Sequence, residues 1–260
     1  MWGIIPAAGI GSRMQPLAFS KELLPVGIRS EEGVERPRAV SEYLVERMIL
    51  AGATNLCFVV SPGKSDIIQY FGSRIGQTHI CYVVQSQPAG LCNAIFHAVP
   101  WIDPQQQVLV GLPDTVWFPE NAFALLPDDQ LSFLLFHVSR PEVFDAVLTD
   151  QNDRVREIRV KQPNPGTPWV WGSFKLTGRI LQDLYRLWKT RSPRDEYLGT
   201  LVNAYLANGG TALGTRVGEE YVDVVTVNGY WDAMKILEDR RRKTSPYRAE
   251  GQSIQALHPI

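Results

Sequence analysis

Residues 3–27 read GIIPAAGIGSRMQPLAFSKELLPVG and place a glycine-rich turn directly after a short apolar run. The first loop after a buried strand is the usual phosphate site of an open α/β sheet. Gly9 and Gly11 permit a positive φ and a close approach of the backbone, so that several amide N–H groups can face an anion. Arg13 and Lys21 add two full positive charges. We therefore expect this stretch to bind a polyphosphate group.

Two better-known phosphate motifs fit the chain poorly. A dinucleotide-binding fingerprint would need a third glycine where Met14 stands, and a loop without Pro16. A Walker loop that ends in the sequence GKS at residues 63–65 would need a glycine at the position of Phe58. The opening stretch is therefore the stronger candidate for binding phosphate.

Four short apolar runs in the first half of the chain lack strict alternation, which is typical of strands buried on both faces. Helical patterns separate these runs, and this order predicts right-handed βαβ units. The expected fold class is α/β, with a Rossmann-like, doubly wound and mostly parallel sheet. The runs are residues 3–5, 56–60, 80–84 and 108–110, and the helices are expected at 40–51, 65–71 and 91–99.

After Asp128 the pattern changes, and strand-like runs outnumber helical ones. We predict one domain over residues 1–243, with two halves at about 1–128 and 129–243, followed by a tail over 244–260. Residues 29–38 and 162–168 are predicted loops. The later strands are expected at 131–138, 145–149, 154–161, 169–176, 211–217 and 221–227, and the helices at 179–188, 196–208 and 232–242.

The composition is that of an ordinary folded protein, with 45% hydrophobic and 20% charged residues among 260. The 26 basic and 27 acidic residues give a net charge of -1, so no global field recruits nucleic acid or an anionic membrane. The three cysteines lack metal-ligand spacing, and no run approaches the roughly 18 apolar residues that span a bilayer. We expect a cytoplasmic protein with small-molecule partners, and we leave self-association into a homo-oligomer open.

Several motifs resemble those of the sugar-1-phosphate nucleotidylyltransferases, the NDP-sugar pyrophosphorylases. The opening stretch, with GIGSR followed by KELLP, is similar to the branches that use UTP or dTTP with glucose 1-phosphate. Further motifs follow in the family's order over about residues 3–240. They are Gln85-x-x-Pro88-x-Gly90, Leu112-Pro113-Asp114, Lys161-x-Pro163, Gly172-Ser173-Phe174, Asp195-Glu196 with Thr200, and Tyr230-Trp231-Asp232.

This resemblance implies a nucleotide-diphospho-sugar transferase fold, in which the strands after residue 128 form an inserted sugar-binding region. It also implies transfer of a nucleotidyl group from UTP or dTTP to a sugar 1-phosphate. Two polyanions must meet, so positioning and charge neutralisation supply most of the catalysis. The implied catalytic residues are Arg13, Lys21, Asp114 and Lys161; the nucleotide-binding residues are Ala8, Gly9, Gly11, Ser12, Arg13, Lys21, Gln85 and Gly90; the sugar-binding residues are Lys161 and Gly172, to which we add Asp145 as a candidate of this chain.

The cofactor that the resemblance implies is Mg²⁺, held by Asp114 and Asp232. Asp114 follows a predicted buried strand, where a carboxylate gains nothing from burial unless it meets a cation. Asp232 begins a predicted helix, where an N-cap is the alternative role. Magnesium takes one or two carboxylates together with substrate oxygens and water, which suits such a pair. Gln85 has the donor and acceptor needed to bind the edge of a pyrimidine, and Gln87 is the alternative residue for this role. The sequence does not distinguish a site for uracil from one for thymine.

The chain departs from the family where the sugar is expected to bind. The family's "YG" appears as Phe144-Asp145, and the glutamate of its "EKP" appears as Val160. Near the expected metal site, the glycine two positions after Asp232 is Met234. Losing a carboxylate acceptor leaves substrate hydroxyls unpaired, so we hypothesise a sugar other than unmodified glucose, with Asp145 as the replacement acceptor.

Two alternative functions stay open on the sequence alone. A non-catalytic, nucleotide-sugar-binding regulatory homologue would retain the fold but is expected to lose Arg13, Lys21 or an aspartate, and all of these are present. A guanylyl- or cytidylyltransferase shares the opening loop, yet it leaves the motifs at residues 85–91 and 195–200 unexplained.

Overall fold

The computed structural model describes residues 1–244 of the chain. The predicted tail therefore lies outside the described residues, apart from Thr244, which ends the last helix. The boundary near residue 128 between a nucleotide half and a sugar half stays a prediction.

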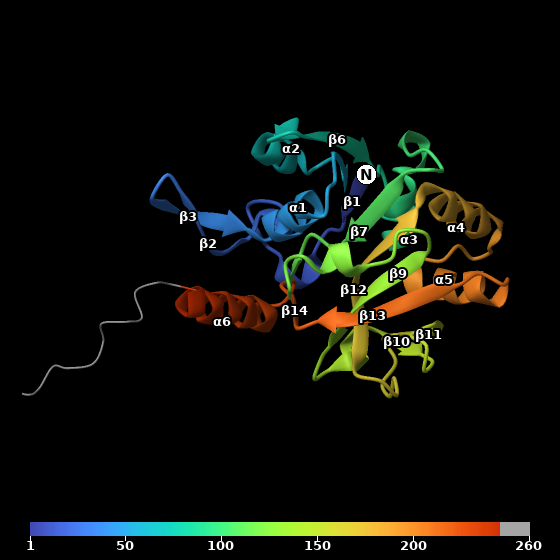
Figure 1. Ribbon diagram of the computed structural model, residues 1–260. Coiled ribbons are helices and arrows are strands. Elements are labelled where there is room, and N and C mark those ends of the chain that lie inside the picture. Colours follow the sequence, from blue (N-terminus) through green and yellow to red (C-terminus); the bar gives the residue numbers. More distant parts are fainter. Residues whose placement is uncertain (245–260) are drawn as a thin grey trace, which may run out of the picture.

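A ten-stranded sheet forms the centre of the molecule (Figure 1). Its middle is parallel, as the apolar runs predicted, and consists in spatial order of β7 (Gln107–Gly111), β1 (Trp2–Ala7), β4 (Asn55–Val60) and β6 (Thr78–Val84). The fold class predicted from the sequence, α/β with a largely parallel sheet, is confirmed.

Mostly antiparallel strands from the second half of the chain extend this sheet beyond β7. The first of them, β12 (Trp169–Thr177), pairs antiparallel with β7 and also with two further strands. The others are β10 (Asp145–Thr149), β11 (Val155–Val160), β9 (Leu131–His137) and β13 (Ala212–Gly218), while the short β5 (Arg74–Ile75) pairs with β6 at the opposite edge.

Helices cover both faces of the sheet. Successive residues of a strand point their side chains to opposite faces, so each central strand contributes apolar side chains to both. Ile4 belongs to a core cluster with α3 (Gly90–Phe96), α4 (Gly178–Thr190) and α5 (Leu198–Ala207). Ile5, the next residue, belongs to a second cluster with α1 (Val40–Leu50) and α2 (Ser65–Phe71). The continuous apolar runs are thus explained by burial on two sides, and short 3-10 turns lie at Ser12–Met14, Lys21–Leu23, Val99–Trp101, Ala122–Leu125 and Pro141–Val143.

The prediction of a loop at residues 29–38 was wrong. The strands β2 (Pro25–Glu31) and β3 (Val34–Ala39) form a hairpin there, and it projects from the molecule near the last helix, α6 (Val227–Thr244) (Figure 1). Its outer residues are charged and exposed, so the hairpin lacks the apolar alternation that predicts a strand. The available signal was Glu32-Gly33, since both residues have a positive φ and form its two-residue turn.

A small two-stranded sheet lies beside the end of β7. It pairs β8 (Thr115–Phe118), which was not predicted, with β14 (Glu220–Asp223), which ends earlier than predicted. The helix α6 begins at Val227, five residues before the predicted start. Among residues 1–244, no helix combines the length and the hydrophobicity needed to cross a lipid bilayer.

Candidate active site

A cavity of about 370 Å³ lies beyond the carboxyl ends of the parallel strands. This is where open α/β sheets bind ligands. Its walls come from the loops after β1, β6 and β7 and from the strand region in the second half of the chain. Nine of the predicted site residues line it, namely Ala8, Gly9, Arg13, Lys21, Gln85, Gly90, Asp114, Asp145 and Lys161.

The loop after β1 is shaped by a glycine that passes close to a lysine. Gly11 has a φ of 69°, and a Cβ atom built on it would lie 2.5 Å from Cδ of Lys21. Only glycine meets both demands without strain. Gly11 and Ser12 do not line the cavity themselves. The effect of Gly11 on the cavity is indirect, because the absence of a Cβ leaves the space through which the Lys21 side chain reaches the cavity.

Lys21 forms an ion pair with Asp114, and both side chains are largely buried. Burial lowers the pKa of Lys21, but the carboxylates of Asp114 and Glu22 outweigh that effect and the pKa lies above its ordinary value. Lys21 therefore stays charged at neutral pH. Its position beside Asp114 joins the loop after β1 to the end of β7.

Asp223 is the functional candidate that the sequence analysis missed. It lies opposite Thr115 in the β8–β14 pair, and the N–H of Val224 donates to the carbonyl oxygen of Asp114 at 2.9 Å. Asp223 and Asp114 therefore face the same cavity. Burial, and then the negative charge of Asp114, raises the pKa of Asp223 to about 6, while Arg13, 3.9 Å from its carboxylate, opposes the shift.

The predicted pairing of Asp114 with Asp232 needs correction. Because α6 begins at Val227, Asp232 falls in the second turn of that helix, where it is exposed to solvent, and it does not line the cavity. The usable signal was the short run Tyr221-Val222-Asp223, which places a carboxylate at the end of a strand just as Leu112-Pro113-Asp114 does.

Two carboxylates held side by side in a partly buried site suit a divalent cation. Within the described chain, no group of three or more His, Cys, Asp or Glu side chains is arranged to hold a metal ion. Asp114 and Asp223 alone fit Mg²⁺, because that ion takes its remaining ligands from water and phosphate oxygens.

Another wall of the cavity carries the side-chain amide of Gln85, whose NH₂ group already donates a hydrogen bond within the protein. Gln85 is buried, and its Nε2 donates to Oδ1 of Asn93 at 2.6 Å, which leaves Oε1 as an acceptor. Gly90 has a φ of 81°, and a Cβ there would lie 2.7 Å from Cα of Glu196. This close approach fixes the start of α3 next to Gln85, whereas Gln87 is exposed and does not line the cavity.

The second half of the chain supplies an aromatic end to the cavity, around Asp145 and Lys161. Burial raises the pKa of Asp145, and the positive charge of Lys161 opposes the shift. Nζ of Lys161 lies 4.7 Å from the centre of the Tyr197 ring. Gly172 does not line the cavity, but a Cβ on it would lie 2.5 Å from the ring of Tyr221, so this glycine makes room for an aromatic wall.

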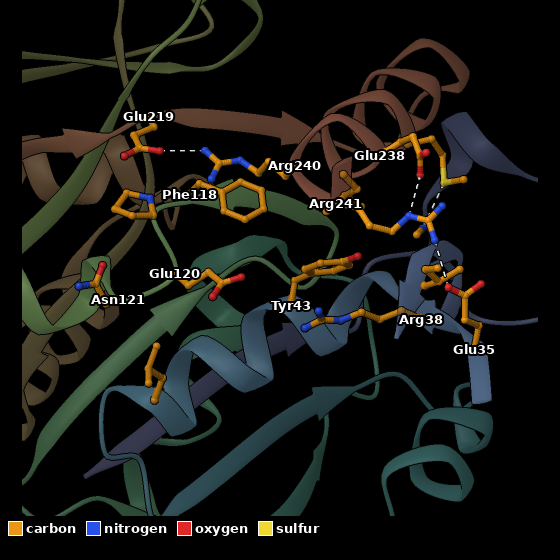
Figure 2. A pocket seen from close by; sticks show the side chains of 16 residues that line it. Glu35, Arg38, Tyr43, Phe118, Glu120, Asn121, Glu219, Glu238, Arg240 and Arg241 are labelled. Carbon is orange, nitrogen blue, oxygen red and sulfur yellow. Dashed lines mark hydrogen bonds and ion pairs between the residues drawn. The ribbon is translucent and has the colours of Figure 1, made fainter. Parts of the chain in front are cut away.

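A larger cavity, of about 790 Å³, lies elsewhere and contains none of the predicted site residues. Figure 2 shows it between α1, the end of β8 and α6, with the guanidinium of Arg240 stacked 3.7 Å from the ring centre of Phe118. Size alone therefore does not identify the active site. The smaller cavity is the better candidate because it combines a glycine-rich loop, cationic side chains and two carboxylates.

A model of the nucleotidyl transferase family matches residues 2–240, and the chain belongs to that family. It is similar to a glucose-1-phosphate thymidylyltransferase of Mycolicibacterium smegmatis, with 26% identity over 90% of this chain and 81% of the relative. It is also similar to a UTP–glucose-1-phosphate uridylyltransferase of Mycoplasma pneumoniae, with 29% identity over 45% of each.

Among solved structures, a UDP-glucose pyrophosphorylase complexed with UDP-glucose superposes with a TM-score of 0.72. The two share 17% identity over 92% of this chain and 99% of that one, so this likeness concerns the fold. The family resemblance inferred from the motifs is confirmed.

The burial of Asp223 and, after it, the like charge of Asp114 predict that Asp223→Asn stabilises the ligand-free protein at pH 8. The carboxyl of Asp223 loses its proton near pH 3.8 when unfolded and near pH 6 when folded. The unfolded state therefore binds fewer protons between these values, and the contribution of Asp223 to stability falls as pH rises through this window. We expect a gain of about 1–2 kcal/mol in the free energy of unfolding at pH 8, and little gain at pH 4.

Urea unfolding at both pH values in the presence of a chelator measures this gain. The control is Asp232→Asn, an exposed aspartate for which we expect no pH-dependent difference. A destabilised Asp223→Asn protein at pH 8 would contradict the cost that we assign to burying this charge beside Asp114.

Proposed function

We propose that this protein transfers a nucleotidyl group from UTP or dTTP to a sugar 1-phosphate and releases pyrophosphate. The observation that carries the proposal is the meeting of Arg13, Lys21 and Lys161 with the carboxylates of Asp114 and Asp223 in one cavity. Three cations and a carboxylate pair are what two polyanions and a divalent cation require.

In the reaction, a phosphate oxygen of the sugar 1-phosphate attacks the α-phosphorus of the triphosphate. A new P–O bond forms, the bond from the α-phosphorus to the bridging oxygen of the β-phosphate breaks, and pyrophosphate leaves. No general base is needed, because the sugar phosphate is already ionised near neutral pH. Catalysis then rests on positioning and on neutralising charge.

Arg13 and Lys21 neutralise the triphosphate. Arg13 offers a planar fork of donors and Lys21 a point charge. In the ligand-free protein Lys21 is bound to Asp114, and we expect it to exchange this carboxylate for a phosphate oxygen when the triphosphate binds. Asp114 and Asp223 would hold Mg²⁺, which when bound neutralises phosphate oxygens. Lys161, at the other end of the cavity, binds the sugar phosphate.

The base is a pyrimidine with an N–H donor at its pairing edge. Oε1 of Gln85 is the acceptor left over from the bond to Asn93, and it accepts from N3–H of uracil or thymine, an atom that is an acceptor in cytosine. Relatives that are named for thymidylyl and uridylyl transfer support both bases.

The sugar site presents the carboxylate of Asp145 as an acceptor. The indole of Trp171 lies close enough to favour the charged form of Asp145, although its buried N–H makes no hydrogen bond of normal geometry within the described residues. Asp145 lines the cavity, so a substrate hydroxyl can donate to its carboxylate. Because an acidic side chain stands here in place of the family's glycine, we propose a sugar other than unmodified glucose.

We expect pyrophosphate to appear only when UTP or dTTP, a sugar 1-phosphate and Mg²⁺ are all present. Asp114→Ala and Asp223→Ala are each expected to lower kcat/KM by at least about a hundredfold, since each removes a ligand of the cation. Asp232→Ala, the matched control, should keep wild-type activity. The measurement is pyrophosphate release over a grid of four nucleoside triphosphates and a panel of sugar 1-phosphates. Silence over the whole grid, while a nucleotide still binds, would favour a regulatory homologue.

Asp145→Asn keeps the size of the side chain and removes its charge. We expect KM for the best sugar phosphate to rise about tenfold, because a charged acceptor is lost, while KM for the nucleoside triphosphate stays unchanged. Steady-state kinetics with each substrate varied in turn separates the two constants. The control is Asp183→Asn on the exposed side of α4. Glucose 1-phosphate as the best substrate, with no effect of Asp145→Asn, would contradict the assignment of the sugar site.

A further inference from the structure

A buried lysine, Lys64, contacts the loop after β1 without lining the cavity. Nζ of Lys64 lies 2.7 Å from the carbonyl oxygen of Gly9 and 2.7 Å from each carboxylate oxygen of Glu22. The side chains of Lys64 and Glu22 are only 9% and 1% exposed. Lys64 is the lysine of the weak Walker match at residues 63–65, yet it does not line the cavity, so it does not meet phosphate directly.

The contact with Gly9 sets the direction of a peptide group. A trans peptide is planar, and its C=O and N–H point in opposite directions. Holding the Gly9 carbonyl toward Lys64 therefore turns the following N–H, that of Ile10, away from α2. Within residues 1–244 this N–H has no acceptor. The Ile10 N–H is thus left without a protein acceptor next to Gly9, which lines the cavity, while a carbonyl oxygen that would repel phosphate is held back.

The contact with Glu22 fixes the other side of the loop. Glu22 is the neighbour of Lys21 in the same short 3-10 turn, so clamping its carboxylate also restrains the backbone that carries Lys21. One residue earlier, the N–H and the hydroxyl of Ser20 each donate to Asp66 at 2.6 Å. The start of α2 therefore holds residue 9 and residues 20–22, which are the two ends of the loop.

The ion pair is poorly explained by stability alone. Burial lowers the pKa of Lys64, and Glu22 opposes the shift; burial raises the pKa of Glu22, and Lys64 and Lys21 oppose it. Taking two charges out of water offsets most of their attraction, and apolar replacements of such pairs are often neutral or stabilising. A role in holding geometry accounts for the pair better.

We propose that Lys64 is a positioning residue for the nucleotide, which orients the Gly9 peptide and, through Glu22, places Lys21. The proposal rests on the proposed function in taking a nucleoside triphosphate as the ligand. A purely structural role predicts that nucleotide binding recovers when stability is restored. A positioning role predicts that nucleotide binding stays weak even then.

The test separates folding from positioning by removing one charge or both. Lys64→Met leaves Glu22 buried without its hydrogen-bond partner, so we expect a lower Tm and weaker binding. In Lys64→Met/Glu22→Leu no unpaired charge remains, so we expect the Tm to recover. The Gly9 carbonyl still lacks its donor, so binding of UTP and dTTP stays roughly tenfold to a hundredfold weaker, as with other lost positioning contacts. Lys189→Met on α4, an exposed lysine, is the control.

Calorimetric binding of UTP and dTTP without sugar phosphate is the primary readout, and KM for each substrate is the second. We expect KM for the nucleotide to rise while KM for the sugar phosphate stays the same. Nucleotide affinity that recovers together with Tm would overturn the proposal. Should the double variant not fold, wild-type affinity in Lys64→Met, measured in the cold, would overturn it as well. If the wild-type protein binds neither nucleotide, the proposed function fails. If the wild-type protein binds a nucleotide and the Lys64 variants bind it equally well, only the inference about Lys64 fails.

Discussion

The repulsion between Asp114 and Asp223 is the constraint on which the rest of the site depends. Two strands that are distant in sequence, β8 and β14, pair so that these carboxylates share one cavity. In the ligand-free protein Lys21 and Arg13 compensate for the two negative charges. Both cations come from the glycine-rich loop, so the loop and the carboxylates are electrostatically one unit. A cation and a polyphosphate can replace these internal pairs, which is how the geometry leads to nucleotidyl transfer.

Charges alternate along a path from the cavity into the protein. Asp114 binds Lys21, Lys21 is followed by Glu22, and Glu22 binds Lys64. Each member moderates the cost of burying its neighbour. The result is a site that holds charged cationic side chains at the cavity before substrate arrives, so that Lys21 has only to exchange Asp114 for a phosphate oxygen. Charge held close to the reacting groups in this way is a main source of rate enhancement in phosphoryl chemistry. The stability given up by holding Asp223 next to Asp114 is then a consequence of function.

Much of this could be predicted from the sequence, and the failures have physical causes. The strands β1, β4, β6 and β7 were found because burial on both faces leaves a continuous apolar run. The β2–β3 hairpin was missed because its side chains face water. The motif Tyr230-Trp231-Asp232 resembles the family's and points to Asp232, while the feature that decides between Asp232 and Asp223 is the pairing of β14 with β8. That pairing joins residues about a hundred positions apart, and no local sequence pattern predicts it. The position of Lys64 behind the loop is equally non-local.

The most direct test of the account is a crystal structure of the protein with Mn²⁺ and a non-hydrolysable analogue of UTP, in which anomalous scattering locates the metal. We expect the metal peak between the carboxylates of Asp114 and Asp223, and we expect Lys21 to have moved from Asp114 to the triphosphate. A triphosphate bound with its metal away from this pair, or with the Lys21–Asp114 ion pair intact, would contradict the account.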